Sequence, residues 1–203
     1  MGKDLQGEPG RRRTMRGVTL IELMVGIAVL AIILAFAVPS FTEFLEKTRL
    51  RGAADALSSQ FAQARVEAMR TDRTVSLLVD GEDDAWCTGA RQFVETGVIG
   101  ITSGAGSATC DCSTKPAECV VAGNQSVLDS DDYPGVLLKD SDGITVKFDQ
   151  KTGALVDLTK KTLKLRSEKY PDRFGLDVET TPLGHARTCI PSGFANFGGF
   201  APC

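Results

Sequence analysis

The sequence predicts an α+β fold, in which one long N-terminal helix packs on an antiparallel β-sheet. Three observations support this prediction. A continuous apolar run occupies residues 18–38, and apolar residues at helical spacing follow it to about residue 70. From residue 74 the pattern changes to short alternating runs separated by turn signals. The chain has 203 residues, which is enough for one globular domain and an appendage.

The apolar run, VTLIELMVGIAVLAIILAFAV, contains one ionisable side chain, Glu22. At about 1.5 Å per residue, a helix of this length spans a hydrocarbon core of about 30 Å. Residues 1–17 contain five basic and two acidic side chains, so we expect them to stay in the cytoplasm while the rest is exported. The run is too long for an ordinary secretory signal and lacks a small-x-small cleavage site. A plain single-pass anchor is the alternative interpretation.

Glu22 argues against a plain anchor. A carboxylate inside an apolar helix costs about 2.5 to 3.5 kcal/mol near the bilayer centre and less near the interface, so it usually has a partner. Cleavage after Gly17 would create a free amine on Val18, four residues before Glu22. That amine could pair with Glu22 of the same chain or of a neighbouring chain. Between chains, the pair would fix the axial register of the helices.

The stretch RGVTLIELMVGIAVLAIILAFAVPSF closely resembles the class III signal and N-terminal helix of type IV pilins and type II secretion pseudopilins. The resemblance implies that residues 1–17 are a leader, which prepilin peptidase removes after Gly17. It also implies that Val18 becomes an N-methylated terminus, that Glu22 serves assembly and that Pro39 kinks the helix. Val18 replaces the phenylalanine usual in the family. The implied partners are major and minor pilins, first in the inner membrane and then in a periplasmic or extracellular filament.

After Pro39 the helix is predicted to continue as an amphipathic half over residues 39–72. Its apolar stripe, which we expect to pack on the sheet, consists of Leu50, Ala54, Leu57, Phe61, Ala64 and Ala68. The opposite face carries Arg51, Asp55, Ser59 and Gln63. RLRGAADALSSQFAQARVEAMRTDRTVSLLV resembles the segment after the anchor in the FimT/GspH group of minor pilins and pseudopilins, most clearly at ARVEAM.

Residues 73–203 are predicted to form an exported β-rich domain. The predicted strands are 74–79, 91–95, 135–139, 144–149, 154–158, 162–166, 174–179 and 185–190. Asp80-Gly81, Asp142-Gly143 and Thr152-Gly153 have the composition of hairpin turns. The acidic clusters 80–84 and 129–132 lack the complete calcium-loop pattern, so we interpret them as solvated turns.

Six cysteines, an even number, all follow the apolar run, which indicates disulfides in an oxidising compartment. Cys110, Cys112 and Cys119 lie in a long irregular loop, residues 97–132, and Cys87 is their natural fourth member. Cys110 and Cys112 are too close to bond each other readily. Each therefore pairs with Cys87 or with Cys119, which leaves two connectivities open.

The C-terminal tail, residues 184–203, contains Cys189 and Cys203, which could close it into a loop. Some FimT-type minor pilins bind DNA through a C-terminal G-R-x-R segment. Gly184-His185-Ala186-Arg187 resembles this segment but has His185 at the first basic position. We favour the alternative interpretation, in which the tail packs on a sheet edge or contacts the next pilin.

No catalytic or metal-binding pattern is present in the sequence. There is no GxSxG, no glycine-rich phosphate loop before a helix, and only one histidine. We therefore expect no enzyme, no cofactor and no metal. The sequence predicts a minor type IV pilin that initiates or caps a filament. The alternatives are a GspH-type pseudopilin of type II secretion and, in a different class, a DNA receptor at the pilus tip.

Overall fold

The computed structural model describes residues 17–93 and 109–203, without the side chains of 36–40. The predicted leader, residues 1–17, therefore lies outside the described residues apart from Gly17. The chain divides into two compact units, Met1–Thr42 and Glu43–Cys203, which we describe separately. The helix α1 (Leu20–Thr71) contributes its first part to one unit and its second part to the other.

The described part of the first unit is an exposed apolar helix. Thr19 precedes α1, and its Oγ1 accepts a hydrogen bond from the backbone N–H of Glu22 at 3.3 Å. The large apolar side chains between Val18 and Leu34 are each more than half exposed. α1 is helical through Pro39, so the proline does not interrupt it, and the kink there stays a prediction. Among the helices formed by described residues, none is long and apolar enough to cross a membrane.

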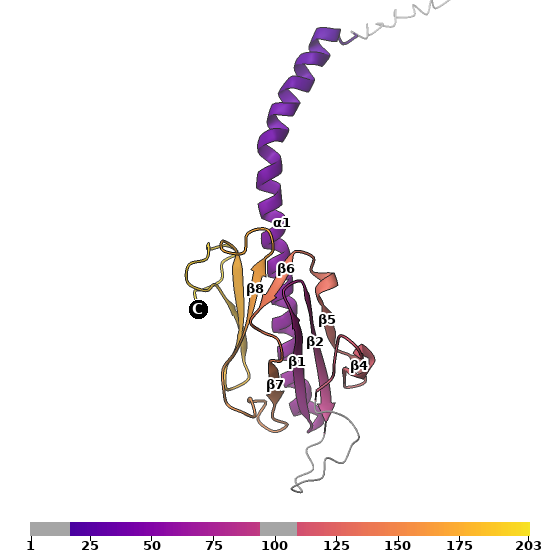
Figure 1. Cartoon of the computed structure of the whole chain (residues 1–203), viewed down its shortest axis with the longest axis vertical. Helices are drawn as coiled ribbons and strands as arrows, with labels where there is room; N and C mark the ends of the chain where they lie inside the picture. Colours follow the sequence, from indigo (N-terminus) through magenta and orange to yellow (C-terminus); the bar gives the residue numbers. More distant parts are fainter. Residues whose placement is uncertain (1–16, 94–108) are drawn as a thin grey trace, which may run out of the picture. The chain divides into compact units, whose positions relative to one another are not determined.

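The described part of the second unit contains the rest of α1, ten strands and two short 3₁₀ helices (Figure 1). The strands are β1 (Thr74–Glu82), β2 (Ala85–Phe93), β3 (Val120–Val121), β4 (Asn124–Gln125), β5 (Val127–Asp129), β6 (Val136–Lys139), β7 (Thr145–Phe148), β8 (Lys161–Ser167), β9 (Gly175–Thr180) and β10 (Ala186–Cys189). The 3₁₀ helices are η1 (Pro116–Glu118) and η2 (Ser130–Asp132). The chain is therefore α+β, as the sequence predicts.

The strands form two four-stranded sheets, in the orders β5-β2-β1-β7 and β10-β9-β8-β6, and a small pair, β3-β4. Every pair of described strands is antiparallel. The sheets are joined where the chain passes from β6 to β7 through Asp142-Gly143, so this turn is not a hairpin turn as predicted. Backbone hydrogen bonds between Asp83 and Leu138 add a second link between the sheets.

Three further sequence predictions are corrected. Asp80-Gly81 lies inside β1, and the β1–β2 turn is formed by Asp83-Asp84, where Asp83 has φ of 58°. The predicted strand 91–95 is the end of a longer strand, β2, which begins at Ala85. Residues 154–158 do not form the predicted strand: they form turns and a single bridge, from Leu155 to Phe148. The Leu155 N–H donates to the Pro182 carbonyl and the Val156 N–H donates to the Lys147 carbonyl, so the segment lies along the edge strand β7.

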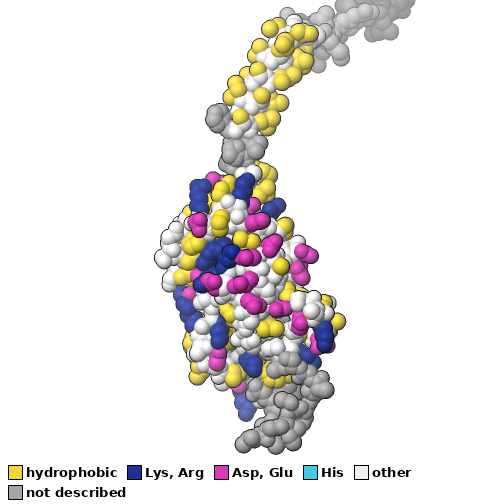
Figure 2. Space-filling view, in the orientation of Figure 1, with side chains coloured by type: hydrophobic (Ala, Val, Ile, Leu, Met, Phe, Trp, Pro, Cys, Tyr) yellow, Lys and Arg dark blue, Asp and Glu magenta, His cyan; other side chains and the backbone are white. Residues whose placement is uncertain are grey.

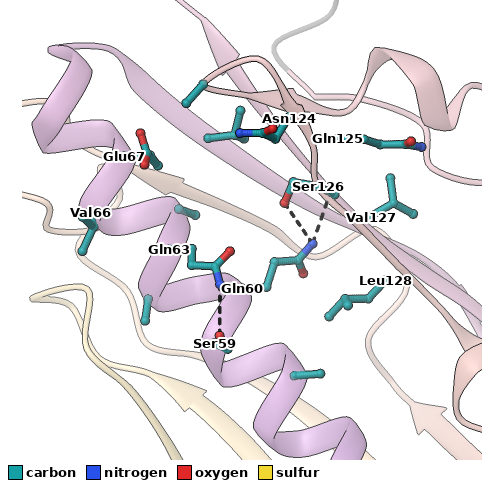
Figure 3. Close-up of a pocket in the computed structure, with 15 residues that line it drawn as sticks. Ser59, Gln60, Gln63, Val66, Glu67, Asn124, Gln125, Ser126, Val127 and Leu128 are labelled. Carbon is teal, nitrogen blue, oxygen red and sulfur yellow. Dashed lines mark hydrogen bonds between the residues drawn. The ribbon is translucent and has the colours of Figure 1, made fainter.

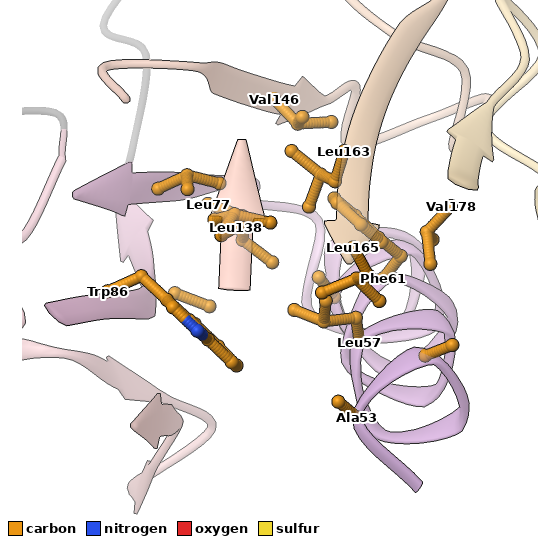
Figure 4. Close-up of a cluster of buried hydrophobic side chains, with 14 of the residues drawn as sticks. Ala53, Leu57, Phe61, Leu77, Trp86, Leu138, Val146, Leu163, Leu165 and Val178 are labelled. Carbon is orange, nitrogen blue, oxygen red and sulfur yellow. The ribbon is translucent and has the colours of Figure 1, made fainter. Parts of the chain in front are cut away.

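The core lies between the second part of α1 and the two sheets. Every residue of the predicted apolar stripe is at most 2% exposed, and Ala53 joins the stripe. Figure 4 shows Leu57 and Phe61 of α1 among side chains from both sheets, including Leu77, Leu165 and Val178. The opposite face of the helix is exposed, as predicted. Helical periodicity thus places one face of α1 in contact with both sheets.

Candidate functional site

The segment around the predicted cleavage point is irregular and exposed. Residues 17–19 precede the helix and have no regular secondary structure, and Val18 is 71% exposed. A Cβ atom added at Gly17 would meet no atom within 4 Å. The described part of the chain therefore leaves room for a protease around the Gly17–Val18 bond. Any requirement for glycine would come from the protease and not from this chain.

Glu22 lies in the first turn of α1 and is exposed. Its side chain has no ion-pair partner among the described residues of this chain. A negative charge in the first turn interacts favourably with the helix dipole, which stabilises it only modestly. A partner for Glu22 would therefore come from residues 1–16, from the amine created at Val18 or from another chain.

All six cysteines, each within the described residues, form disulfides. Cys87 pairs with Cys112 and Cys110 pairs with Cys119, which is one of the two connectivities that the sequence leaves open. All four of these cysteines are buried. The Cys87–Cys112 disulfide ties the described segment before β3 to β2, and the Cys110–Cys119 disulfide closes that segment on itself. The described part of the predicted loop is therefore pinned by disulfides, as expected.

Gly89 in β2 lies beneath the two disulfides. A Cβ atom at this position would lie 2.6 Å from Cys119 Sγ, 2.7 Å from Cys110 Sγ and 3.1 Å from Cys112 Cβ. No other residue type fits there without a shift of buried atoms. Sequence reasoning missed this residue, although a glycine inside a strand is a known signal of a close approach.

A groove of about 630 Å³ lies between α1 and the segment from β3 to β5 (Figure 3). Gln60, 6% exposed, joins its two walls: Nε2 donates to the carbonyl oxygen of Ser126 at 3.4 Å, and Oε1 accepts from Thr88 Oγ1 at 2.6 Å. The lining is mostly amide, hydroxyl and small apolar groups. Glu67 supplies the carboxylate of this lining, and its Oε2 forms an ion pair with Arg70 Nη2 at 2.8 Å. This lining offers no arrangement for acid–base or nucleophilic chemistry.

The C-terminal tail is closed by a disulfide between Cys189 and Cys203, as the sequence analysis expects. Ile190 bridges Pro202, so the end of the tail lies along the edge of the second sheet. The tail phenylalanines pack against the core, where Phe194 stacks under the Arg166 guanidinium at 4.5 Å. These rings are therefore not free to stack on bases.

The two residues of the DNA-binding hypothesis are in different situations. His185 is exposed in a turn, and its backbone N–H donates to Thr181 Oγ1. Arg187 makes two hydrogen bonds to Glu179 Oε2, at 2.7 and 3.0 Å, and Lys160 bonds the other carboxylate oxygen at 2.5 Å. The Glu179 side chain is 5% exposed. Because Arg187 and Lys160 share this one buried carboxylate, the Arg187 guanidinium is engaged within the chain, and this weighs against its use for phosphate binding.

The acidic clusters are turns only in part: residues 80–82 end β1 and Asp83-Asp84 form the β1–β2 turn, whereas Asp129 ends β5 and residues 130–132 form η2. Asp83 pairs with Lys139, and the Asp129 carboxylate accepts the backbone N–H of Asp131. Within the described residues, the two groups of side chains with metal-binding spacing each contain a disulfide-bonded cysteine pair. A disulfide sulfur is not the thiolate that a metal requires.

The chain matches two family models. Residues 12–38 match the prokaryotic N-terminal methylation motif, and residues 53–181 match the type II transport protein GspH. A curated relative, the type II secretion system protein H of Xanthomonas campestris pv. campestris, is 31% identical over 78 residues. The match covers 38% of this chain and 46% of the relative, so the chain spans about half the length of the curated relative that it matches.

Among solved structures, the chain is similar to the type IV minor pilin FimU of Pseudomonas aeruginosa in two crystal forms, at 19% identity. The TM-scores are 0.45 and 0.43, over 71% and 68% of this chain and 90% and 91% of the FimU chains. The GspH model covers well over half of the sequence, including the second part of α1 and nearly all the strands. The chain belongs to the GspH family of type II transport proteins.

Proposed function

We propose that this chain is a structural subunit of a pilin-type filament, a minor type IV pilin that initiates or caps the filament. The observation that carries the proposal is the position of the N-terminal methylation motif. The motif ends at residue 38, within the same helix whose buried stripe forms the core of the GspH domain. One helix thus joins an exposed apolar segment to a folded body, as a subunit held by its helix requires.

In this proposal, prepilin peptidase cuts after Gly17, and Val18 becomes the methylated terminus. The apolar side chains of 18–38 hold the subunit in the inner membrane before assembly. In the filament they pack against the helices of other major and minor pilins. The Glu22 carboxylate then pairs with a terminal amine, because leaving it without a partner in an apolar bundle is costly. The body, Glu43–Cys203, remains outside the membrane, where its disulfides are stable.

A second candidate within the same class is a pseudopilin of type II secretion. The name of the curated relative favours it, since that protein is a type II secretion system protein. Both candidates use the same processing and the same helix bundle. Deletion of the gene distinguishes them: loss of surface pili supports the minor pilin, whereas loss of secreted enzymes with intact pili supports the pseudopilin.

The test of subunit function is recovery of the chain in sheared filaments. Glu22→Ala should leave membrane insertion intact, because it removes a charge from the apolar segment, but it should reduce recovery at least tenfold. Glu22→Asp is the matched control and should retain part of the recovery, since it keeps the charge. Equal recovery of wild type and Glu22→Ala would contradict the assembly role of Glu22.

The DNA-receptor hypothesis is tested by a gel-shift titration at low salt. Because Arg187 is held by Glu179, we expect no salt-sensitive shift of duplex DNA by the full chain. A shift that disappears in both Arg187→Gln and His185→Gln would contradict this expectation and assign the tail to DNA.

A further inference from the structure

The first four-stranded sheet ends in a strand that pairs on one side alone. In the order β5-β2-β1-β7, β5 is a terminal strand, and a single residue, Ser126, separates it from β4. β4, Ser126 and β5 together form the segment 124–129, which at about 3.4 Å per residue is about 20 Å long. We call this segment the open edge.

Main-chain hydrogen bonds show which side of the open edge is already paired. The N–H of Ser126 donates to the Cys119 carbonyl at 2.8 Å, and the Ser126 carbonyl accepts from the Ala90 N–H at 2.9 Å. The N–H and the carbonyl of one strand residue point to the same side of the strand. The partners of the open edge, β2 and the segment 119–121, therefore both lie on that side.

The other side of the open edge presents the main-chain groups of Gln125, Val127 and Asp129, because successive strand residues point these groups to opposite sides. Among the residues that the structure describes, none forms a main-chain hydrogen bond to them. Gln125 is exposed, and Val127 is half-buried, since its side chain packs against the four buried cysteines. A row of unpaired donors and acceptors along a strand is a template for another strand.

The groove beside Gln60 is bounded by the open edge and by one flank of α1 (Figure 3). On this flank Ala62, Gln63 and Val66 are exposed, Val66 by 53%. Neighbouring strands lie about 4.8 Å apart, and their side chains alternate between the two faces of the sheet. A strand added to the open edge would therefore direct every second side chain toward α1, where small apolar groups fit the lining.

Charge within the groove does not select the occupant. Among the described residues of the lining, Glu67 is the charged one, and it is already paired with Arg70 at 2.8 Å. Acidic side chains gather on the face of the second unit in view in Figure 2. Those at the end of the open edge, Asp129, Asp131 and Asp132, lie outside the groove lining. The groove thus offers main-chain hydrogen bonds with apolar and amide surface.

We propose that the open edge takes up an extended segment of a neighbouring subunit as an additional strand of the sheet. The occupant is an extended polypeptide because a strand supplies donors and acceptors at the alternating spacing that the open edge presents. One edge accepts one strand, so the contact does not require several copies of this chain. This is consistent with a subunit that initiates or caps a filament. The proposal rests on the proposed function, since it names a contact made within the filament.

The first test compares amide hydrogen exchange of the full chain in detergent micelles and in sheared filaments, by mass spectrometry of peptides that contain residues 124–129. In micelles the Val127 and Asp129 amides should exchange rapidly, because they bond to water. In filaments their exchange should slow by about tenfold or more, because they bond to the added strand. Slow exchange already in micelles would mean that this chain or a second copy fills the edge, and would overturn the proposal.

The second test removes one donor from the free side. Val127→Pro deletes an N–H that points away from β2, and proline is tolerated on an edge strand at such a position. Recovery of the chain in sheared filaments should fall about tenfold, because the partner strand loses a hydrogen bond and meets the proline ring. Val127→Ala is the matched control: it loses the same packing but keeps the N–H, so recovery should stay near that of wild type. An intact mass with all six cysteines oxidised verifies that both variants fold.

The third test blocks the groove from its helical wall. Val66→Lys places a charge where the added strand would pack, and it should lower recovery about tenfold. Val156→Lys is the control, since Val156 is 48% exposed and lies outside the lining. Equal recovery of Val127→Pro and Val127→Ala, or unchanged recovery of Val66→Lys, would overturn the proposal. The proposed function would then stand, because the chain still enters filaments. Absence of wild type from the filaments would instead contradict that function.

Discussion

Gly89 shows how a single position determines the arrangement of two disulfides. Its missing side chain lets Cys110–Cys119 and Cys87–Cys112 pack directly on β2. The sequence indicates four cysteines near one another but does not select their pairing. The selection depends on which sulfur atoms reach the surface of β2, and this is a property of the folded sheet.

Gly89→Ala should therefore lower the free energy of unfolding by about 1 to 3 kcal/mol, the usual cost of overpacking a buried site. Gly52→Ala is the matched control in α1, where an added Cβ would find its nearest atom at 3.9 Å. It should be neutral or stabilise by up to about 1 kcal/mol. Urea titration measures both changes. An unaltered stability in Gly89→Ala would show that the disulfides can shift without cost.

Glu179 is a buried carboxylate of the second unit whose pKa is set by two opposing effects. Burial disfavours its charged form, but hydrogen bonds and attraction from Lys160 and Arg187 outweigh burial and lower its pKa below the ordinary 4.5. A carboxyl group with a lowered pKa in the folded state stabilises the fold above its unfolded pKa. That contribution is lost as the pH falls, so the stability of this chain should decrease below about pH 4.5.

Glu179→Gln should flatten this acid dependence. We expect the difference in free energy of unfolding between about pH 6 and pH 3 to be smaller than in wild type, because the variant has no carboxyl group to protonate there. Glu82→Gln is the control, since Glu82 is exposed and has no ion-pair partner among the described residues. If both variants keep the full acid dependence of wild type, Glu179 is not responsible for it.

At the scale of elements, α1 was the most predictable part of the molecule. Spacings of three and four residues between apolar side chains predict one buried face, and every member of the predicted stripe is buried. The exposed face was predicted equally well. Helical periodicity predicts burial correctly here because α1 packs on the two sheets along one continuous face and exposes the opposite face to solvent.

Phe61→Ala should lower the free energy of unfolding by about 3 to 5 kcal/mol, because Phe61 is fully buried and contacts Phe148 edge to face with centroids 6.4 Å apart. Gln63→Ala, two residues away on the exposed face, should change stability by less than about 0.5 kcal/mol. The single tryptophan, Trp86, is 2% exposed and reports unfolding by fluorescence. Similar losses in the two variants would contradict this assignment of the core.

The strands were less predictable than the helix. β3, β4 and β5 have two or three residues each and lie inside the predicted irregular loop, where alternation has too few positions to appear. The alternating segment 154–158 pairs with β7 only through the Leu155–Phe148 bridge and the hydrogen bond from Val156 to Lys147. Its other backbone hydrogen bonds join it to Asp149 and Pro182 or lie within the segment itself, so it forms turns and does not continue as a strand. Turn composition also failed to separate a hairpin from a crossing between sheets at Asp142-Gly143.

For the whole molecule, the sequence was sufficient for the fold class and for the family resemblance. The features predicted at the N-terminus, Gly17, Val18 and Glu22, are local in sequence, so a motif can reveal them. The groove beside Gln60 and the contact of Arg187 with Glu179 were not predictable. Each joins segments far apart in the chain, and their proximity depends on how the two sheets are connected.

The central claim is that this chain is processed and assembled as a filament subunit. The most direct measurement is the intact mass of the chain recovered from sheared filaments of a strain with active prepilin peptidase. The account predicts a single species that begins at methylated Val18, with all six cysteines oxidised. A chain that begins at Met1 or after Ser40, or one that is absent from the filament fraction, would contradict it.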